Sequence, residues 1–170
     1  MDKNKIAVFA GSFDPFTLGH LDIVRRASEL FDALWILVAK NESKKNMFDV
    51  ETRMSMIELS VSNLSNVKVD CFNGLTVDFM QSVGARYLVR GVRGSVDLDY
   101  EQAVAWNNRN LDGNAETVLL LSAPEHLSIS SSVVRELLKC GFAGKNIEEK
   151  LSKFVPCEIL KKFLTEYRKG

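Results

Sequence analysis

The sequence contains little of what marks interdomain linkers and disulfide frameworks. Its 170 residues include three prolines, ten glycines and three cysteines. So few prolines and glycines leave little room for a linker, and we expect a single domain over residues 1–170. The cysteines, Cys71, Cys140 and Cys157, are odd in number, far apart and in no metal-binding spacing. They are therefore expected to be reduced thiols, which suits a cytoplasmic protein.

Net charge and long apolar runs are also missing. Lysine plus arginine equals aspartate plus glutamate at 22 each, and this balance, with no long basic run, argues against nucleic acid as a partner. The apolar run after the first five residues is too short for a signal peptide, and no stretch is long enough to span a bilayer. With 46% apolar residues, the composition is that of a soluble globular protein. We expect no membrane partner.

Short apolar segments alternate with helical patterns along most of the chain. Segments of strand length occur at Lys5–Ala10, Ala33–Ala39, Val67–Phe72, Tyr87–Arg90 and Thr117–Leu121. They are predominantly apolar, which is typical of strands buried on both faces of a parallel sheet. Helical patterns lie between them, at Leu21–Leu30, Val50–Leu64, Thr76–Val83 and Asp97–Asn110. This alternation predicts an α/β fold with a doubly wound, five-stranded parallel sheet. Further helices are expected at Val133–Cys140, Ile147–Phe154 and Pro156–Tyr167.

The segment between the first strand and the first helix has the composition of a phosphate-binding loop. Residues 11–20 read Gly-Ser-Phe-Asp-Pro-Phe-Thr-Leu-Gly-His. A strand, a loop and a helix start in this order aim backbone N–H groups and the helix dipole at a phosphate. Gly11 is expected to leave room for a ligand. His20 could donate a hydrogen bond to a phosphate oxygen as charge builds on it, or be a purely structural helix-start residue.

Basic residues follow two other predicted strands. Lys44 and Lys45 come after the second strand, where either lysine could neutralise a phosphate or simply face solvent. Arg90 and Arg93 flank a glycine at the end of the fourth strand, and guanidinium forks suit phosphate oxygens. Because the carboxyl ends of strands in an open α/β sheet line the ligand crevice, these segments are candidates for a binding site.

Three consecutive serines, Ser130, Ser131 and Ser132, precede another helical pattern. One of them is enough to cap the helix. The remaining hydroxyl and N–H groups could form a second anion site at the helix start.

Together these segments resemble bacterial phosphopantetheine adenylyltransferases, which belong to the nucleotidyltransferase superfamily with a T/HxGH motif. Thr17-Leu18-Gly19-His20 matches that motif, and the resemblance covers nearly the whole chain. The other matched patterns are Ser-Lys-Lys-x-x-Phe at 43–48, Arg-Gly-x-Arg at 90–93, Asp-x-x-Tyr-Glu at 97–101 and Ile-Ser-Ser-Ser at 129–132. The resemblance implies a Rossmann-like nucleotidyltransferase fold and a homohexamer. It also implies transfer of AMP from ATP to 4′-phosphopantetheine, giving dephospho-coenzyme A and pyrophosphate.

The resemblance also implies roles for individual residues. The implied catalytic residues are His20, Lys44 and Arg93. The implied substrate-binding residues, at the phosphopantetheine, are Ser12, Lys44, Thr76 and Arg90. The implied ATP-binding residues are Ser12, Phe13, His20, Gly91, Val92, Arg93, Glu101, His126, Leu127, Ser128, Ile129, Ser130, Ser131 and Ser132.

Three points remain open at this stage. Lys45 could take the role of Lys44, and Thr76 could be a helix cap or first-turn residue instead of a ligand. Family members often carry an aromatic residue near His126 or Leu127, and this chain does not. No clustered carboxylates suggest a protein-built metal site, so Mg²⁺ is expected on the ATP phosphates.

Three other functions compete with this interpretation. A sister nucleotidyltransferase with another phosphorylated acceptor would share the first loop and the serine helix. A catalytically silent nucleotide-binding module would need neither His20 nor both arginines. A dinucleotide-dependent oxidoreductase requires Gly-x-Gly-x-x-Gly after the first strand, and Gly11-Ser12-Phe13 does not supply it.

Overall fold

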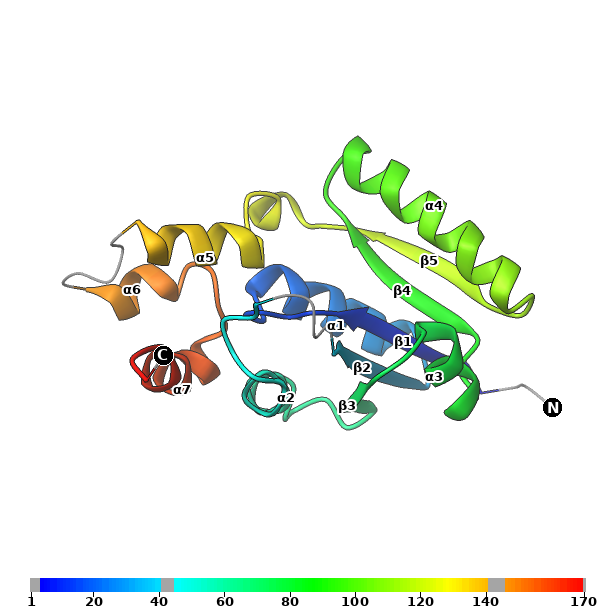
Figure 1. Ribbon diagram of the computed structural model, residues 1–170, viewed down its shortest axis with the longest axis horizontal. Coiled ribbons are helices and arrows are strands. Elements are labelled where there is room, and N and C mark those ends of the chain that lie inside the picture. The colour runs from blue at the N-terminus through cyan, green and yellow to red at the C-terminus, as the bar shows by residue number, and fades with distance from the viewer. Residues whose placement is uncertain (1–3, 41–44, 141–145, 170) are drawn as a thin grey trace.

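Five parallel strands form one sheet, and helices cover both of its faces (Figure 1). The computed structural model describes residues 4–40, 45–140 and 146–169. Its strands are β1 (Ile6–Gly11), β2 (Ala33–Ala39), β3 (Val67–Phe72), β4 (Tyr87–Val92) and β5 (Glu116–Leu121). They lie in the order β3-β2-β1-β4-β5. The predicted α/β fold with a five-stranded parallel sheet is therefore confirmed.

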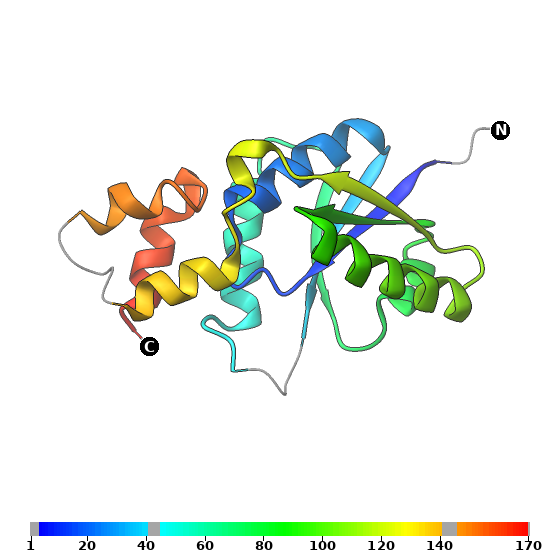
Figure 2. The same cartoon turned by 90° about the horizontal axis from the view of Figure 1, so that it is seen from above.

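The strands β1 and β2 are continuously apolar because each of their faces enters a different core. β3 differs from the prediction: it lies at the edge of the sheet, and Lys68 and Asp70 interrupt its apolar residues. In β1, Ala7 and Phe9 pack with α1 (Leu18–Leu30) and α2 (Val50–Ser60). Val8 and Ala10 point to the other face and pack with α3 (Thr76–Ser82). α4 (Ser95–Leu111) contacts β4 and β5, and Figure 2 shows it on the side of the sheet opposite to α1.

The C-terminal helices form a third core beyond the sheet. They are α5 (Ser131–Lys139), α6 (Ile147–Leu151) and α7 (Leu160–Tyr167), and they lie together at one end of the molecule (Figure 1). Their apolar residues pack against Phe48 and Met56. Because Ile57 and Val61 face the sheet, α2 is buried on two sides and joins the C-terminal core to the sheet.

Several helix boundaries differ from the prediction. α1 begins at Leu18 instead of Leu21, because the Thr17 side chain accepts the N–H of His20 and caps the helix there. α2 ends at Ser60 instead of Leu64, since Leu64 N–H donates to Val61 C=O in a separate turn. Pro156 has an extended backbone, so it precedes a 3₁₀ turn and α7 begins only at Leu160.

The remaining differences are small. Bounds shift by one or two residues at β1, β4, β5, α3, α4 and α5, and α6 ends at Leu151 instead of Phe154. Shifts of one or two residues are common at helix and strand ends, and among these elements only the end of α6 differs by more. Among the described residues, no helix is long and apolar enough to cross a membrane.

The strand order creates a crevice between β1 and β4. From β1 the chain moves outward to β2 and β3, and then returns to place β4 on the other side of β1. The loops that follow β1 and β4 therefore lead in opposite directions. Ligands of open α/β sheets bind at such a switch point, outside the carboxyl ends of the strands.

Candidate active site

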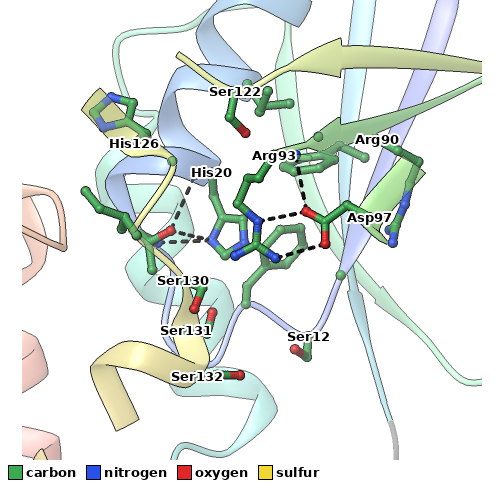
Figure 3. Close-up of a pocket in the computed structure, with 18 of the residues that line it drawn as sticks. Ser12, His20, Arg90, Arg93, Asp97, Ser122, His126, Ser130, Ser131 and Ser132 are labelled. Atoms are coloured by element: carbon green, nitrogen blue, oxygen red, sulfur yellow. Dashed lines mark hydrogen bonds and ion pairs between the residues drawn. The ribbon is translucent and has the colours of Figure 1, made fainter. Parts of the chain in front are cut away.

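A cavity of about 460 Å³ opens at the carboxyl ends of β1 and β4 (Figure 3). Its walls come from the loop after β1, the start of α1, the end of β4, the first turns of α4 and the start of α5. It brings together most of the predicted site residues: Ser12, Phe13, His20, Arg90, Gly91, Arg93, Glu101, His126, Ile129, Ser130, Ser131 and Ser132.

Other predicted residues lie elsewhere. Val92 and Leu127 line a smaller apolar cavity next to the first one, because the side chain of Val92 points away from the crevice. Ser128 is exposed and lines neither cavity. Thr76 is the first residue of α3 and also lies off the cavity wall. Lys44 lies outside the described residues.

A capping box orients the ring of His20. The Thr17 N–H donates to Nδ1 of His20 at 3.1 Å, and the Thr17 hydroxyl lies 3.0 Å from the same atom. In return, Thr17 Oγ1 accepts the backbone N–H of His20. A backbone N–H can only donate, so Nδ1 is the acceptor and a neutral ring carries its proton on Nε2. This hydrogen-bond network therefore leaves Nε2–H as the donor of His20.

Aromatic side chains surround the same ring. Phe16 stacks on it with centroids 5.5 Å apart, Phe13 meets it edge-on at 5.1 Å, and Phe9 lies at 6.3 Å. Burial, and then the nearby charges of Arg93 and Arg90, lower the pKa of His20 from 6.5 to about 4. The imidazole is therefore neutral at physiological pH and serves as a hydrogen-bond donor, not as a cation.

Gly11 also packs against an aromatic ring of its own loop. A Cβ at this position would lie 2.9 Å from the ring of Phe13. The missing side chain therefore makes room for the ring of Phe13, beside the cavity that Gly11 lines. Phe13 itself has a φ of 48°, in the left-handed region, which turns its ring under His20.

Buried charges hold the loop that carries Ser12. Arg53 is 1% exposed, and its Nη1 donates to the carbonyl of Ser12 at 2.6 Å. The Asp14 carboxylate accepts the N–H groups of Met47 and Phe48 at 2.7 and 3.0 Å. Together these contacts tie the loop after β1 to the segment that precedes α2.

The two arginines of the opposite wall are held by different carboxylates. Glu101 pairs with Arg90 through two hydrogen bonds of 2.6 and 2.7 Å, and Arg90 Nη1 also donates to the Ala10 carbonyl. Asp97 pairs with Arg93, with Nε 2.9 Å from Oδ2. The hydrogen bond from Arg93 holds the pKa of Asp97 below its ordinary value.

The starts of α1 and α5 both face the cavity, but they offer different donors. In α1, the N–H of Leu18 donates to the Phe154 carbonyl and the N–H of His20 donates to Thr17. In α5, Ser130 caps the helix by accepting the N–H of Val133 at 3.2 Å. The N–H groups of Ser131 and Ser132 have no acceptor within the part of the chain that the structure describes. The start of α5 is therefore the better site for an anion.

Comparison with known proteins shows the family of the chain. A family model described as cytidylyltransferase-like matches residues 8–137. The phosphopantetheine adenylyltransferase of Limosilactobacillus reuteri (strain DSM 20016) is 47% identical over 154 residues, which cover 88% of this chain and 89% of the relative. That of Lachnoclostridium phytofermentans is 42% identical over 163 residues, 96% of each. The chain belongs to the phosphopantetheine adenylyltransferase family.

A solved structure shows the same fold outside this family. It is that of a putative nicotinate-nucleotide adenylyltransferase from Vibrio parahaemolyticus, with a TM-score of 0.69 at 19% identity. The match covers 99% of this chain and 98% of that one. At this identity the likeness concerns the fold alone.

Several cavity residues received no role from the sequence, among them the polar residues Asp97, Tyr100, Ser122 and Arg135. Ser122 directly follows β5, and a residue after a parallel strand could have been considered on that ground. Arg135 lies one turn after the serine segment, donating to the Asp14 carbonyl at 2.6 Å and to Ser132 Oγ at 3.1 Å. Asp97 and Tyr100 belong to a matched motif, but nothing in the motif indicates a partner for either.

Proposed function

We propose that this protein transfers AMP from ATP to 4′-phosphopantetheine, giving dephospho-coenzyme A and pyrophosphate. One observation carries the proposal: a neutral His20 with a fixed tautomer shares a single cavity with two arginines and an open helix start. Membership of the family supplies the identity of the two substrates.

The reaction needs no nucleophile from the protein. An oxygen of the acceptor phosphate attacks the α-phosphorus of ATP, a new P–O bond forms, and the bond to the β-phosphate oxygen breaks. Pyrophosphate leaves with the electron pair of that bond. The enzyme must align two anions that repel each other and stabilise the charge that develops on the α-phosphoryl oxygens.

The cavity offers a group for each of these tasks. His20 would donate from Nε2–H to the α-phosphate in the transition state. Arg90, together with Ser12 and the sequence-predicted Lys44, would hold the acceptor phosphate. Arg93 and the N–H groups of the α5 start would hold the part of ATP that leaves as pyrophosphate. Glu101 is fully engaged by Arg90, so its contribution to the nucleotide site would be to orient that arginine.

Mg²⁺ would enter with the triphosphate. Within the described ranges, no group of three or more histidine, cysteine, aspartate or glutamate side chains is arranged to hold a metal ion. Mg²⁺ in nucleotide sites commonly takes its ligands from phosphate oxygens and water, with only one or two carboxylates from the protein. The residues of the cavity therefore fit an ion that is held mainly by the ATP phosphates. The ion would neutralise charge on the triphosphate.

The outer face of α4 supports an oligomer. Glu101 is the buried residue of this helix, while Val96, Tyr100 and Trp106 are 81%, 65% and 64% exposed. Leu121, at the end of β5, is 72% exposed. An apolar surface of this kind commonly marks a protein–protein interface. We propose that it joins copies of this chain in the homohexamer implied by the family, and that the protein is cytoplasmic.

Pyrophosphate release tests the function. The protein is incubated with ATP, Mg²⁺ and 4′-phosphopantetheine, and separately with other phosphorylated acceptors such as nicotinate mononucleotide and glycerol 3-phosphate. We expect release with 4′-phosphopantetheine alone. Turnover with another acceptor, and none with this one, would contradict the proposal and favour a sister nucleotidyltransferase.

A further inference from the structure

We propose that Asp97 is a positioning residue that holds Arg93 with the open edge of its guanidinium toward the triphosphate. This inference rests on the proposed function, in which the cavity receives ATP.

The contacts between the two residues fix one edge of the guanidinium. Oδ2 of Asp97 accepts Nε–H of Arg93 at 2.9 Å and the backbone N–H of Arg93 at 3.2 Å. Oδ1 lies 3.4 Å from Nη2. The Nε–Nη2 edge is thus occupied, and the remaining N–H groups on Nη1 and Nη2 are left for a ligand. Figure 3 shows Arg93 reaching into the cavity between Asp97 and His20.

Arg93 needs such a partner more than Arg90 does. The side chain of Arg93 is 42% exposed, against 24% for Arg90, and Arg90 is already anchored by Glu101 and the Ala10 carbonyl. An arginine without support would lose its rotamer freedom when phosphate binds, and this entropy would weaken binding. Asp97 lies in the first turn of α4, where the helix dipole stabilises a carboxylate.

The same carboxylate also opposes an anionic ligand. A negative charge on the cavity wall repels phosphate, so removal of the charge alone would tighten ATP binding. Loss of positioning would weaken it. The two effects have opposite signs, which makes the role of Asp97 measurable.

Asp97→Asn tests the proposal, with Asp99→Asn as the matched control. Asp99 is exposed on the same helix and makes no hydrogen bond or ion pair within the described part of the chain, so its replacement removes the same charge without disturbing Arg93. The dissociation constants of ATP and of inorganic tripolyphosphate are measured by calorimetry. We expect Asp97→Asn to weaken both by about 3- to 10-fold, the cost of ordering one long side chain, and Asp99→Asn to change neither.

A double-mutant cycle with Arg93→Ala shows whether Asp97 acts through Arg93. In the Arg93→Ala background only the charge effect remains, so we expect Asp97→Asn to cause no loss of ATP affinity there and at most a small gain. Tighter binding by Asp97→Asn alone, an equal loss in Asp99→Asn, or an undiminished loss in the Arg93→Ala background would each overturn the proposal. These measurements need no acceptor, so they stay interpretable even if the protein does not adenylylate 4′-phosphopantetheine.

Discussion

The two walls of the cavity are built by different physical means. On the wall formed by β1 and α1, His20 is held by close packing: Phe13 is 2% exposed and Phe16 is fully buried. On the wall formed by β4 and α4, Arg90 and Arg93 are held by ion pairs with carboxylates of α4, which lie 11 and 4 residues further along the chain.

This difference matches what each wall must present. The packed wall removes water from the imidazole and so keeps it neutral, as a donor of one hydrogen bond. The ionic wall must keep two positive charges close to solvent and ready for anions, and packing alone would penalise such charges by desolvation. Each wall therefore uses the interaction that preserves the charge state of its own side chains.

The largest expected effect is the loss of turnover on removing His20 from the packed wall. His20→Ala should reduce turnover by roughly 10²–10³-fold, the effect of removing one transition-state hydrogen-bond donor. ATP affinity should fall much less, because the start of α5 and Arg93 provide other contacts. His20→Gln should recover part of the rate, since its side-chain amide also carries an N–H. Turnover, ATP affinity and thermal stability are measured on each variant; a stable His20→Ala protein with near-normal turnover would show that His20 has no catalytic role.

The ion pairs should differ in what they contribute to stability. Glu101→Gln breaks the inner pair and should lower the free energy of unfolding by about 1.5–3 kcal/mol, the range for a hydrogen bond to a charged group. Asp97→Asn breaks the more exposed outer pair and should lower it by less than about 1 kcal/mol. Urea unfolding of both variants gives the two values. Equal losses would show that both pairs stabilise the wall in the same way.

The low pKa of His20, on the packed wall, predicts that the stability of the folded protein depends on pH. In the unfolded chain the imidazole takes up a proton as pH falls below 6.5, whereas in the folded protein it does so only near 4. The unfolded state therefore binds more protons between these values, and His20 makes the protein less stable as pH falls from 6.5 to 4. His20→Gln should make the urea midpoint depend less steeply on pH in this window. An unchanged slope would mean that the imidazole is not kept neutral by the fold.

The smallest expected effect on folding comes from the outer face of α4. Trp106 is 64% exposed, so Trp106→Ser should leave the stability of the single chain nearly unchanged, within about 0.5 kcal/mol. It should shift the protein toward smaller assemblies in sedimentation velocity. Leu30→Ser is the control, because Leu30 is 55% exposed on α1, away from this face. A sedimentation profile for Trp106→Ser identical to that of the unaltered protein would place the interface elsewhere.

Much of the fold could be predicted from local sequence. The continuous apolar run Ala33–Ala39 matches β2 residue for residue, because a strand buried on both faces needs no polar alternation. Val67–Phe72 also matches β3 residue for residue, although Lys68 and Asp70 interrupt its apolar residues. Helix ends were less accurate where a single contact decides them, as at Thr17 for α1. The motifs also indicated which loops meet, since the carboxyl ends of parallel strands share one edge of the sheet.

By itself the sequence therefore determined the α/β fold, the family and the loops that form the cavity. The charge state and orientation of the residues within the cavity follow from burial and from contacts between segments that are distant in the chain. The tautomer and neutrality of His20 depend on Thr17 and on burial among phenylalanines. The loop after β1 depends on Arg53, which lies 41 residues from Ser12, and on Arg135, 121 residues from Asp14. Charge state and orientation follow from desolvation and from partners distant in sequence, and local residue patterns carry information about neither.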